Sequence, residues 1–260
     1  MKLYPDKYEE NDFVFFLHIP KTAGTSLTNS LKSAFREDHS LTPFQMNNVR
    51  AHPQEIFLNA ELLYGHFPHE IYAKRLPKQP NFILTFLRDP VAHYVSTFFH
   101  LKMDPTFAYT TRLTSDRQLA EDIHSSLKSA SIEDFLKSSH SQMFDNFQTR
   151  YLVNGLSSGY HHHTDEQLLP VAQRLLLELP FFGLTERFDD SLQLLQTVLG
   201  IGKKLQLLES NKARNKPRNF SPSAEVLTEI QRRTPADSAL YDVAQLAFEA
   251  RLFAHASVVS

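Results

Sequence analysis

Apolar residues along this chain gather in short continuous runs that are each followed by a helical repeat. Runs of this kind occupy Phe13–Leu17, Phe82–Leu87 and Phe181–Leu184, and a fourth ends at Gly65. Such runs predict strands buried on both faces of a parallel sheet. Behind them, apolar residues recur every three or four positions, which is typical of amphipathic helices. The pattern therefore predicts an α/β fold.

Capping signals indicate where these helices begin and end. Thr25 or Ser26 can cap the helix behind the first run, and Asp89 followed by Pro90 starts the helix behind the second. Further helices are expected near 119–127 and 132–137, over 145–155 with a glycine end at Gly155, and from a Thr164/Gln167 capping box to Glu178. The helix over 188–199 ends at Gly200, and two C-terminal helices follow, the first beginning at Ser221 and Pro222.

The length and composition favour one domain. A chain of 260 residues with 42% hydrophobic content can bury a sizeable core, so we expect a single domain over 1–260. Within it, residues 103–180 are expected to form a helical insertion on the side of the acceptor substrate, because insertions of this kind carry specificity.

Charge and cysteine content exclude several classes of protein. The formal net charge is −2 and there is no cysteine, so neither a nucleic-acid partner nor a disulfide framework is indicated. No apolar run approaches the roughly 18 residues of a membrane span. We therefore expect a soluble, cytoplasmic protein.

The residues between the first strand and its helix favour an anion. This stretch, His18–Leu27, reads HIPKTAGTSL. A strand that turns into a helix directs backbone N–H groups and the helix dipole at one point. Lys21 adds a positive charge, Gly24 permits close approach, and hydroxyls come from Thr22, Thr25 and Ser26. The loop fits a phosphate, although the usual G-x-x-x-x-G-K-[ST] nucleotide motif is absent.

A second anion-binding group follows the strand Phe82–Leu87. Arg88 lies at the end of this strand, and Ser96 lies on the helix behind it. An arginine at this edge of a parallel sheet can bind a phosphate with two hydrogen bonds. The alternatives are an ion pair of Arg88 with Asp89 or another neighbour, and an ordinary helical serine at Ser96.

Histidines and a basic stretch complete the candidate chemistry. His66 follows the strand that ends at Gly65 and can act as a general base. His69 is the second candidate for this role. The alternative is that His66 only packs in a loop. Residues 211–222 carry Lys212, Arg214, Lys216 and Arg218 without an acid, which suits either a phosphate-covering loop or a solvated one. The run of three histidines before Thr164 is not expected to bind metal.

Together these stretches resemble the sulfotransferases that use 3′-phosphoadenosine 5′-phosphosulfate (PAPS), in the branch of heparan sulfate 2-O-sulfotransferase. HIPKTAGTSL resembles their 5′-phosphosulfate loop, from Lys21 through Thr22, Ala23, Gly24 and Thr25 to Ser26. Arg88-Asp89-Pro90-Val91 with Ser96 resembles their 3′-phosphate motif, and Arg214, Lys216 and Arg218 match their basic loop. The missing anchor and cysteines make the chain look like a bacterial relative.

The resemblance implies a three-layer sandwich around a parallel sheet, which is the P-loop-like fold of these enzymes. It implies in-line sulfuryl transfer from PAPS to a hydroxyl of a carbohydrate or glycolipid. The other product is PAP, the desulfated nucleotide, and no metal is required. Lys21 would stabilise the leaving oxygen and His66 would be the base, although Tyr64 stands where the family tends to have a second histidine.

Asn146, Gln148 and Arg150 resemble a stretch on the acceptor side of the family and could equally be structural. A magnesium-dependent phosphotransferase and a non-catalytic nucleotide-binding module stay open as other functions.

Overall fold

A five-stranded parallel sheet lies at the centre of the protein. The computed structural model describes residues 8, 12–47, 49–104, 106, 116–160, 162–200, 205 and 220–259. The strand order is β2-β3-β1-β4-β5, and every neighbouring pair is parallel. The strands are β1 (Val14–Leu17), β2 (Ser40–Leu41), β3 (Leu62–Gly65), β4 (Phe82–Leu87) and β5 (Phe181–Leu184). The apolar runs form β1, β3, β4 and β5, as the sequence predicts, whereas β2 was not predicted.

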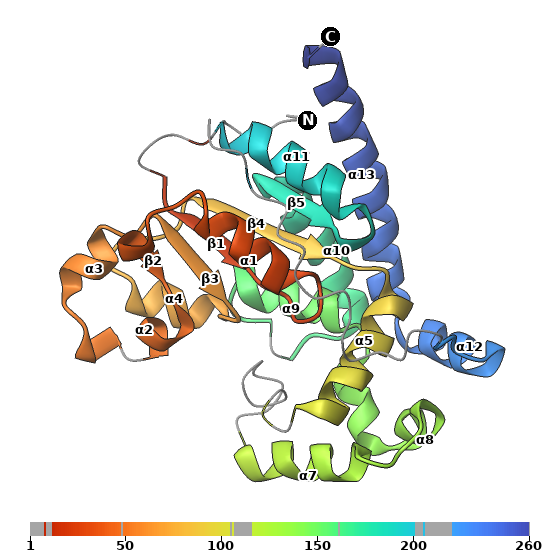
Figure 1. The fold of residues 1–260 in the computed structure, drawn as a ribbon. Helices are drawn as coiled ribbons and strands as arrows, with labels where there is room; N and C mark the ends of the chain where they lie inside the picture. The colour runs from red at the N-terminus through yellow and green to blue at the C-terminus, as the bar shows by residue number, and fades with distance from the viewer. Residues whose placement is uncertain are drawn as a thin grey trace.

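Helices cover both faces of the sheet. α1 (Gly24–Lys32) and α11 (Phe188–Leu199) lie over one face, and α9 (Phe147–Leu156) and α10 (Asp165–Glu178) over the other (Figure 1). Within the described residues, the other helices are α2 (Pro43–Asn47), α3 (Gln54–Leu58), α4 (His69–Arg75), α5 (Pro90–Met103), α7 (Arg117–Leu127), α8 (Ile132–Lys137), α12 (Ala224–Arg233) and α13 (Pro235–Val259). The 3₁₀ turns in the same part of the chain are η1 (Glu37–His39), η2 (Val49–Ala51), η3 (Ser139–Phe144) and η4 (Thr185–Arg187). The expected α/β sandwich with a central parallel sheet is confirmed.

The sheet places its ligand crevice between β1 and β4. From β1 the chain passes through α1 to β2 and β3 on one side, and then returns to β4 on the other side. The chain thus moves in opposite directions from β1 and from β4, and open α/β sheets bind their ligands in a crevice beyond the carboxyl ends of two such strands, so a ligand is expected there. Leu17 pairs with Gly65 and with Thr85, so β1 and β3 end level at this edge while β4 extends two residues further, to Leu87.

Three expected helix ends are wrong. α1 begins at Gly24, and its N-cap is Ala23 in the left-handed conformation without a side-chain cap, so neither Thr25 nor Ser26 caps it. Gly155 lies inside α9 instead of ending it. A Cβ there would lie 2.5 Å from a methyl carbon of Leu17, so the glycine allows the helix to pack closely on β1. α12 is capped by Ser223, two residues after Ser221.

A second hydrophobic cluster lies beside the sheet. α5, α7, α8 and α12 pack their apolar faces together around Tyr94, Phe98 and Phe135. The segment 103–180 is therefore divided, because α9 and α10 pack on the main core under the sheet. Its assignment to the acceptor side stays a prediction.

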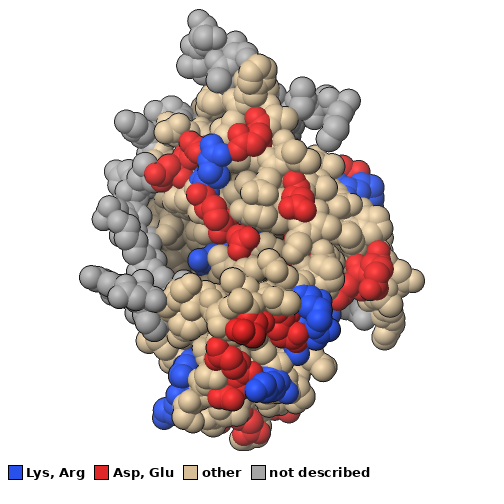
Figure 2. Space-filling model, turned by 90° about the vertical axis from the view of Figure 1, so that its right-hand side faces the viewer, with Lys and Arg blue, Asp and Glu red and all other residues tan. Residues whose placement is uncertain are grey.

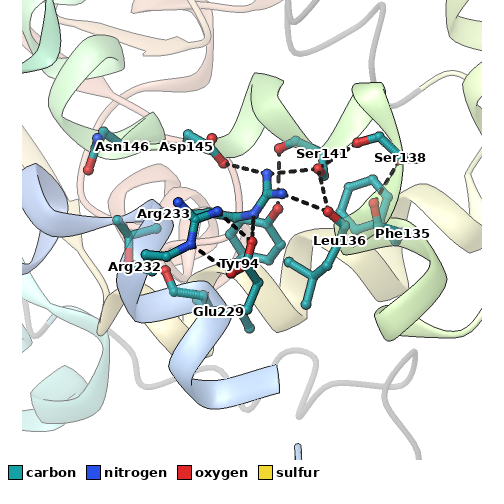
Figure 3. A network of polar contacts seen from close by, with 12 residues as sticks. Tyr94, Phe135, Leu136, Ser138, Ser141, Asp145, Asn146, Glu229, Arg232 and Arg233 are labelled. Atoms are coloured by element: carbon teal, nitrogen blue, oxygen red, sulfur yellow. Dashed lines mark hydrogen bonds and ion pairs between the residues drawn. The ribbon is translucent and has the colours of Figure 1, made fainter. Parts of the chain in front are cut away.

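Arg233 joins α12 to the other helices of this second cluster. Its guanidinium donates to the carbonyl of Leu136 at 2.7 Å, to Ser141 Oγ at 2.9 Å and to Glu229 at 2.6 Å (Figure 3). Asp145 lies 3.5 Å away on the other side. This network fixes the end of α12, where the chain turns into α13, against α8 and η3.

The surface that carries α13 has mixed charge. Acidic side chains lie beside basic ones over the face shown in Figure 2. Arg187, for example, contacts both Asp190 and Glu249. Exposed pairs of this kind contribute little to stability.

α9 and α13 cap each other's N-termini. Asn146, which precedes α9 with a φ of 49°, accepts hydrogen bonds from the N–H groups of Ala236 and Asp237 at the start of α13. In return, the Asp237 carboxylate accepts from the N–H of Gln148 and from both the N–H and the hydroxyl of Thr149. Burial raises the pKa of Asp237 to about 6. The exchange of caps fixes α9 relative to α13.

Removal of the Asp237 carboxylate should destabilise the fold. Asp237→Ala leaves three buried donors of α9 without their acceptor, so we expect a loss of about 2 kcal/mol or more in the free energy of unfolding. Urea denaturation measures it, with the exposed Asp242→Ala on the same helix as control. Equal effects of the two substitutions would contradict the role of the exchanged caps.

Candidate active site

The loop between β1 and α1 is held by side chains that bind four consecutive carbonyls. The carbonyl oxygen of His18 contacts His66 Nδ1 at 2.6 Å, and that of Ile19 accepts from the Thr22 hydroxyl at 2.8 Å. The next two carbonyls, of Pro20 and Lys21, contact His93 Nε2 at 2.9 Å and Arg88 Nη1 at 3.1 Å. Three of these four donors come from other parts of the chain.

Binding of the carbonyls orients the N–H groups of the loop. In a trans peptide the C=O and N–H bonds point in opposite directions, so the N–H groups of Lys21 and Thr22 point away from the bound carbonyls. Lys21 and Ala23 have φ values of 68° and 62°, which curl the chain into the first turn of α1. The first N–H groups of a helix have no intrahelical acceptor. The loop and helix start can therefore receive an anion.

Gly24 is required because of a histidine ring. A Cβ on Gly24 would lie 1.6 Å from Nε2 of His18, whose side chain packs over the start of α1. The His18 ring also stacks on Phe16 at 5.3 Å and lies 4.3 Å from the ring of His66. Burial, followed by the proximity of His66 and Lys21, lowers the pKa of His18 well below its ordinary value. His18 is therefore a neutral ring that supports the loop.

Lys21 and Arg88 place two positive charges at the crevice. Burial and the neighbouring guanidinium of Arg88 lower the pKa of Lys21 to about 8, against an opposing effect of Asp104. Lys21 is thus mostly charged at neutral pH. Two cations this close repel each other, and a ligand with several negative charges relieves the repulsion. The donor set of backbone N–H groups, ammonium and guanidinium fits phosphate groups.

Gln148 and Glu186 position Arg88. The Gln148 side-chain amide accepts from the N–H of Arg88 at 2.9 Å and donates to its carbonyl at 2.8 Å. Glu186 Oε1 lies 3.7 Å from Nε of Arg88, and Glu186 Oε2 accepts from the Tyr241 hydroxyl and the Asp89 N–H. The ion-pair alternative for Arg88 is thus realised with Glu186, whereas Asp89 caps α5 as expected.

His66 has a defined tautomer. Because Nδ1 contacts the carbonyl of His18, which can only accept, this nitrogen carries the proton in the neutral ring. The lone pair is then on Nε2, as a general base requires. The ring of Tyr151 meets that of His66 edge-on at 6.4 Å. His69, the reserve candidate, begins α4 and packs its ring on Tyr72 at 5.2 Å.

The remaining residues expected at the site differ in their burial and in their hydrogen-bond partners. Thr22 is buried and commits its hydroxyl to the loop, whereas Thr25 is exposed and Ser26 partly so. Ser96 lies on α5 one turn after His93. Lys212, Arg214, Lys216 and Arg218 lie outside the described residues. Asn146 and Gln148 have the structural roles given above, and Arg150 binds Asp165 with two hydrogen bonds.

Sequence reasoning missed the residues that shape the loop. One of them is His93, which is buried and whose pKa is lowered to about 3, first by burial. It is therefore a neutral ring that donates its Nε2 proton to Pro20. The spacing of His93 from Arg88 carries no signal for this contact. Gln148 and Glu186 reach Arg88 from 60 and 98 residues away, a separation that local patterns do not encode.

Two observations concern cofactors and membranes. No group of three or more His, Cys, Asp or Glu among the described residues is placed to hold a metal ion. Within the same part of the chain, no helix has both the length and the apolar character required to cross a bilayer.

Comparison with known proteins decides the family. A family model described as "Sulfotransferase family" matches residues 7–246. The chain belongs to the sulfotransferase family. Over 122 residues it is also 27% identical to a protein-tyrosine sulfotransferase from Arabidopsis thaliana. That match covers 46% of this chain and 24% of the relative, so the chain spans about a quarter of the length of the curated relative.

The family membership agrees with the anion-binding geometry of the site. Sulfuryl transfer, the class of reaction that the sequence predicts, is consistent with membership of this family. The crevice beyond β1 and β4, with Lys21 and Arg88 at its edge, is the candidate position for that chemistry.

A double-mutant cycle tests the contact between Gly24 and His18. Gly24→Ala forces the His18 ring to move, so we expect a loss of about 1–3 kcal/mol in the free energy of unfolding. In a His18→Ala background the same substitution should cost far less, because the ring is absent. The measurement is urea denaturation of the four proteins. An equal cost in both backgrounds would show that the ring does not constrain Gly24.

Proposed function

We propose that this protein transfers a sulfuryl group from PAPS to a hydroxyl of an acceptor. The observation that carries the proposal is the loop with four bound carbonyls, which directs N–H groups and Lys21 at one point beside Arg88. The resemblance of this loop to the 5′-phosphosulfate loop of the PAPS-dependent sulfotransferases supports the same function. PAPS carries a phosphosulfate at one end of its ribose and a phosphate at the other, which suits two separated anion sites.

Each of the two anion sites would bind one end of PAPS. The N–H groups around Lys21, Gly24, Thr25 and Ser26 would hold the 5′-phosphosulfate. Arg88, which donates to the carbonyl of Lys21 and is oriented by Gln148, would hold the 3′-phosphate with Ser96. The basic residues Arg214, Lys216 and Arg218 would complete that site. The spacing between the two sites follows from the register of β1 and β4.

The transfer needs a base and a stabilised leaving group. His66 accepts the proton of the acceptor hydroxyl at Nε2, while the hydroxyl oxygen forms a bond to sulfur and the bond from sulfur to the 5′-phosphate oxygen breaks. Lys21 stabilises the negative charge that develops on this oxygen, and PAP leaves. Positioning and electrostatics then supply most of the rate, as in phosphoryl transfer.

Two kinds of acceptor have support. The resemblance to the heparan sulfate 2-O branch supports a carbohydrate or glycoconjugate. The 27% identity to a protein-tyrosine sulfotransferase supports a tyrosine phenol instead. Both acceptors offer a hydroxyl to His66, so the donor chemistry is the same. Membership of the sulfotransferase family disfavours the magnesium-dependent phosphotransferase.

Calorimetric titration with PAP tests the donor site. We expect micromolar binding without magnesium that weakens at least tenfold in Lys21→Ala and in Arg88→Ala, because a hydrogen bond to a charged group contributes about 1.5–3 kcal/mol. The exposed Lys137→Ala on α8 is the control and should bind like the wild type. Binding of ATP with magnesium in place of PAP would overturn the proposal.

Substitution of His66 tests the base. His66→Ala should lower kcat about 10²- to 10⁴-fold, because a general base acts in the chemical step. PAP affinity should fall much less, because only one of the four contacts to the loop carbonyls is lost. Sulfate transfer from ³⁵S-labelled PAPS measures the rate, and His69→Ala serves as the matched control. A loss below about tenfold in His66→Ala, or a larger loss in His69→Ala, rejects His66 as the base. If no variant changes any activity, the protein is a nucleotide-binding module.

A further inference from the structure

A polar cavity lies beside the helix that reaches the candidate base. Its volume is about 430 Å³, and it lies between α9 and the first turn of α10. The lining side chains used below are Arg150, Asn154, Tyr160, His163, Asp165 and Glu166. The reaction proposed above gives none of them a role. A cavity of this size accommodates a small ring-shaped ligand.

The cavity is close to His66 along α9. Tyr151, whose ring meets that of His66, directly follows Arg150 and precedes Asn154 by three residues. At 1.5 Å per residue, Asn154 lies about 4.5 Å further along the helix axis. Because residues three apart are neighbours on a helix surface, the cavity borders the part of α9 that contacts His66. An acceptor made of linked units can place one unit at His66 and the next in the cavity.

The charge in the cavity disfavours an anionic ligand. Arg150 donates to both carboxylate oxygens of Asp165, at 2.7 and 2.9 Å, so the two charges compensate each other. Hydrogen bonds from its own backbone and from Thr164 lower the pKa of Glu166, so its carboxylate is ionised. The ion pair of Arg150 with Asp165 does not neutralise this charge. A uronate, a sulfated sugar or an acidic peptide would meet this negative charge. A neutral ligand would not.

The available polar groups suit a sugar ring. Asn154 offers an amide donor and acceptor, and Glu166 offers a carboxylate, which together can bind adjacent hydroxyls. The rings of Tyr160 and His163 both line the cavity, with their centroids 5.0 Å apart. A pyranose has hydroxyls around its edge and apolar C–H groups on its faces. Its edge can meet the amide and carboxylate while one face packs on the rings.

We propose that this cavity binds a neutral sugar unit of the acceptor, next to the unit whose hydroxyl receives the sulfuryl group. The inference rests on the proposed function and narrows it, because it selects a neutral saccharide over both a polyanionic glycan and a tyrosyl peptide. Asn154 is then a specificity-determining residue, and its conservative replacements should change which sugar is accepted.

Saturation-transfer NMR with neutral disaccharides tests the cavity. Lactose, cellobiose and maltose are titrated into the full chain in the presence of PAP. We expect saturation of one ring of at least one disaccharide, and a dissociation constant that rises about tenfold or more in Asn154→Ala, because two hydrogen bonds are lost. Gln245→Ala, which removes an exposed amide from α13, is the matched control and should leave binding unchanged.

The outcomes distinguish the cavity from the donor site. The inference is wrong if none of the disaccharides binds, or if Asn154→Ala binds them as well as the control does. It is also wrong if a uronate disaccharide or an acidic tyrosyl peptide binds in an Asn154-dependent manner instead. PAP calorimetry on the same samples separates the two proposals. PAP binding without sugar binding overturns only the cavity assignment, whereas failure of PAP to bind overturns the proposed function.

Discussion

The site depends on the fixed direction of four successive carbonyl groups after β1. Side chains of Thr22, Arg88, His93 and His66 bind the carbonyl oxygens of residues 18–21. A short loop with unbound carbonyls could rotate its peptides and present oxygen atoms to an anion. With the carbonyls bound, the N–H groups face the crevice, and the loop is preorganised before any ligand arrives. Most of the other contacts at the site serve to hold these side chains.

The fold brings side chains that hold the loop from the ends of separate strands of one sheet. β3 and β4 pair in parallel with β1 on its two sides, so His66 and Arg88, which follow β3 and β4, emerge on either side of the β1 loop. Gln148 on α9 then fixes the main chain of Arg88, and the exchanged caps of Asn146 and Asp237 fix α9 on α13. The geometry of the loop is therefore linked to a helix that begins more than 200 residues further along the chain.

Local sequence signals predicted every strand of the sheet except the two-residue β2, and they indicated the candidate anion-binding residues. Apolar runs gave β1, β4 and β5, because burial on both faces requires them. Asp89 and the Thr164/Gln167 box gave correct helix starts, because a cap acts within three residues. The start of α1 was missed, because Ala23 in the left-handed conformation leaves no capping side chain to recognise.

Contacts between distant residues could not be predicted in this way. The pattern around Gly24 suggested close approach of a ligand, whereas the structure shows the ring of His18 against its Cα. Gly155 looked like a helix end but permits α9 to pack on Leu17 of β1. His93 and Gln148 appear as ordinary polar helix residues, and only the tertiary structure gives them partners in the site.

A crystal structure with PAP bound would test the central claim most directly. The account predicts the 5′-phosphate against the N–H groups of Lys21 to Ser26, with the four carbonyl contacts of residues 18–21 unchanged from the ligand-free form. It predicts the 3′-phosphate within hydrogen-bond distance of Arg88 and Ser96. A nucleotide bound elsewhere, or a loop whose peptides must flip to admit the phosphate, would contradict the claim that the loop is preorganised for this donor.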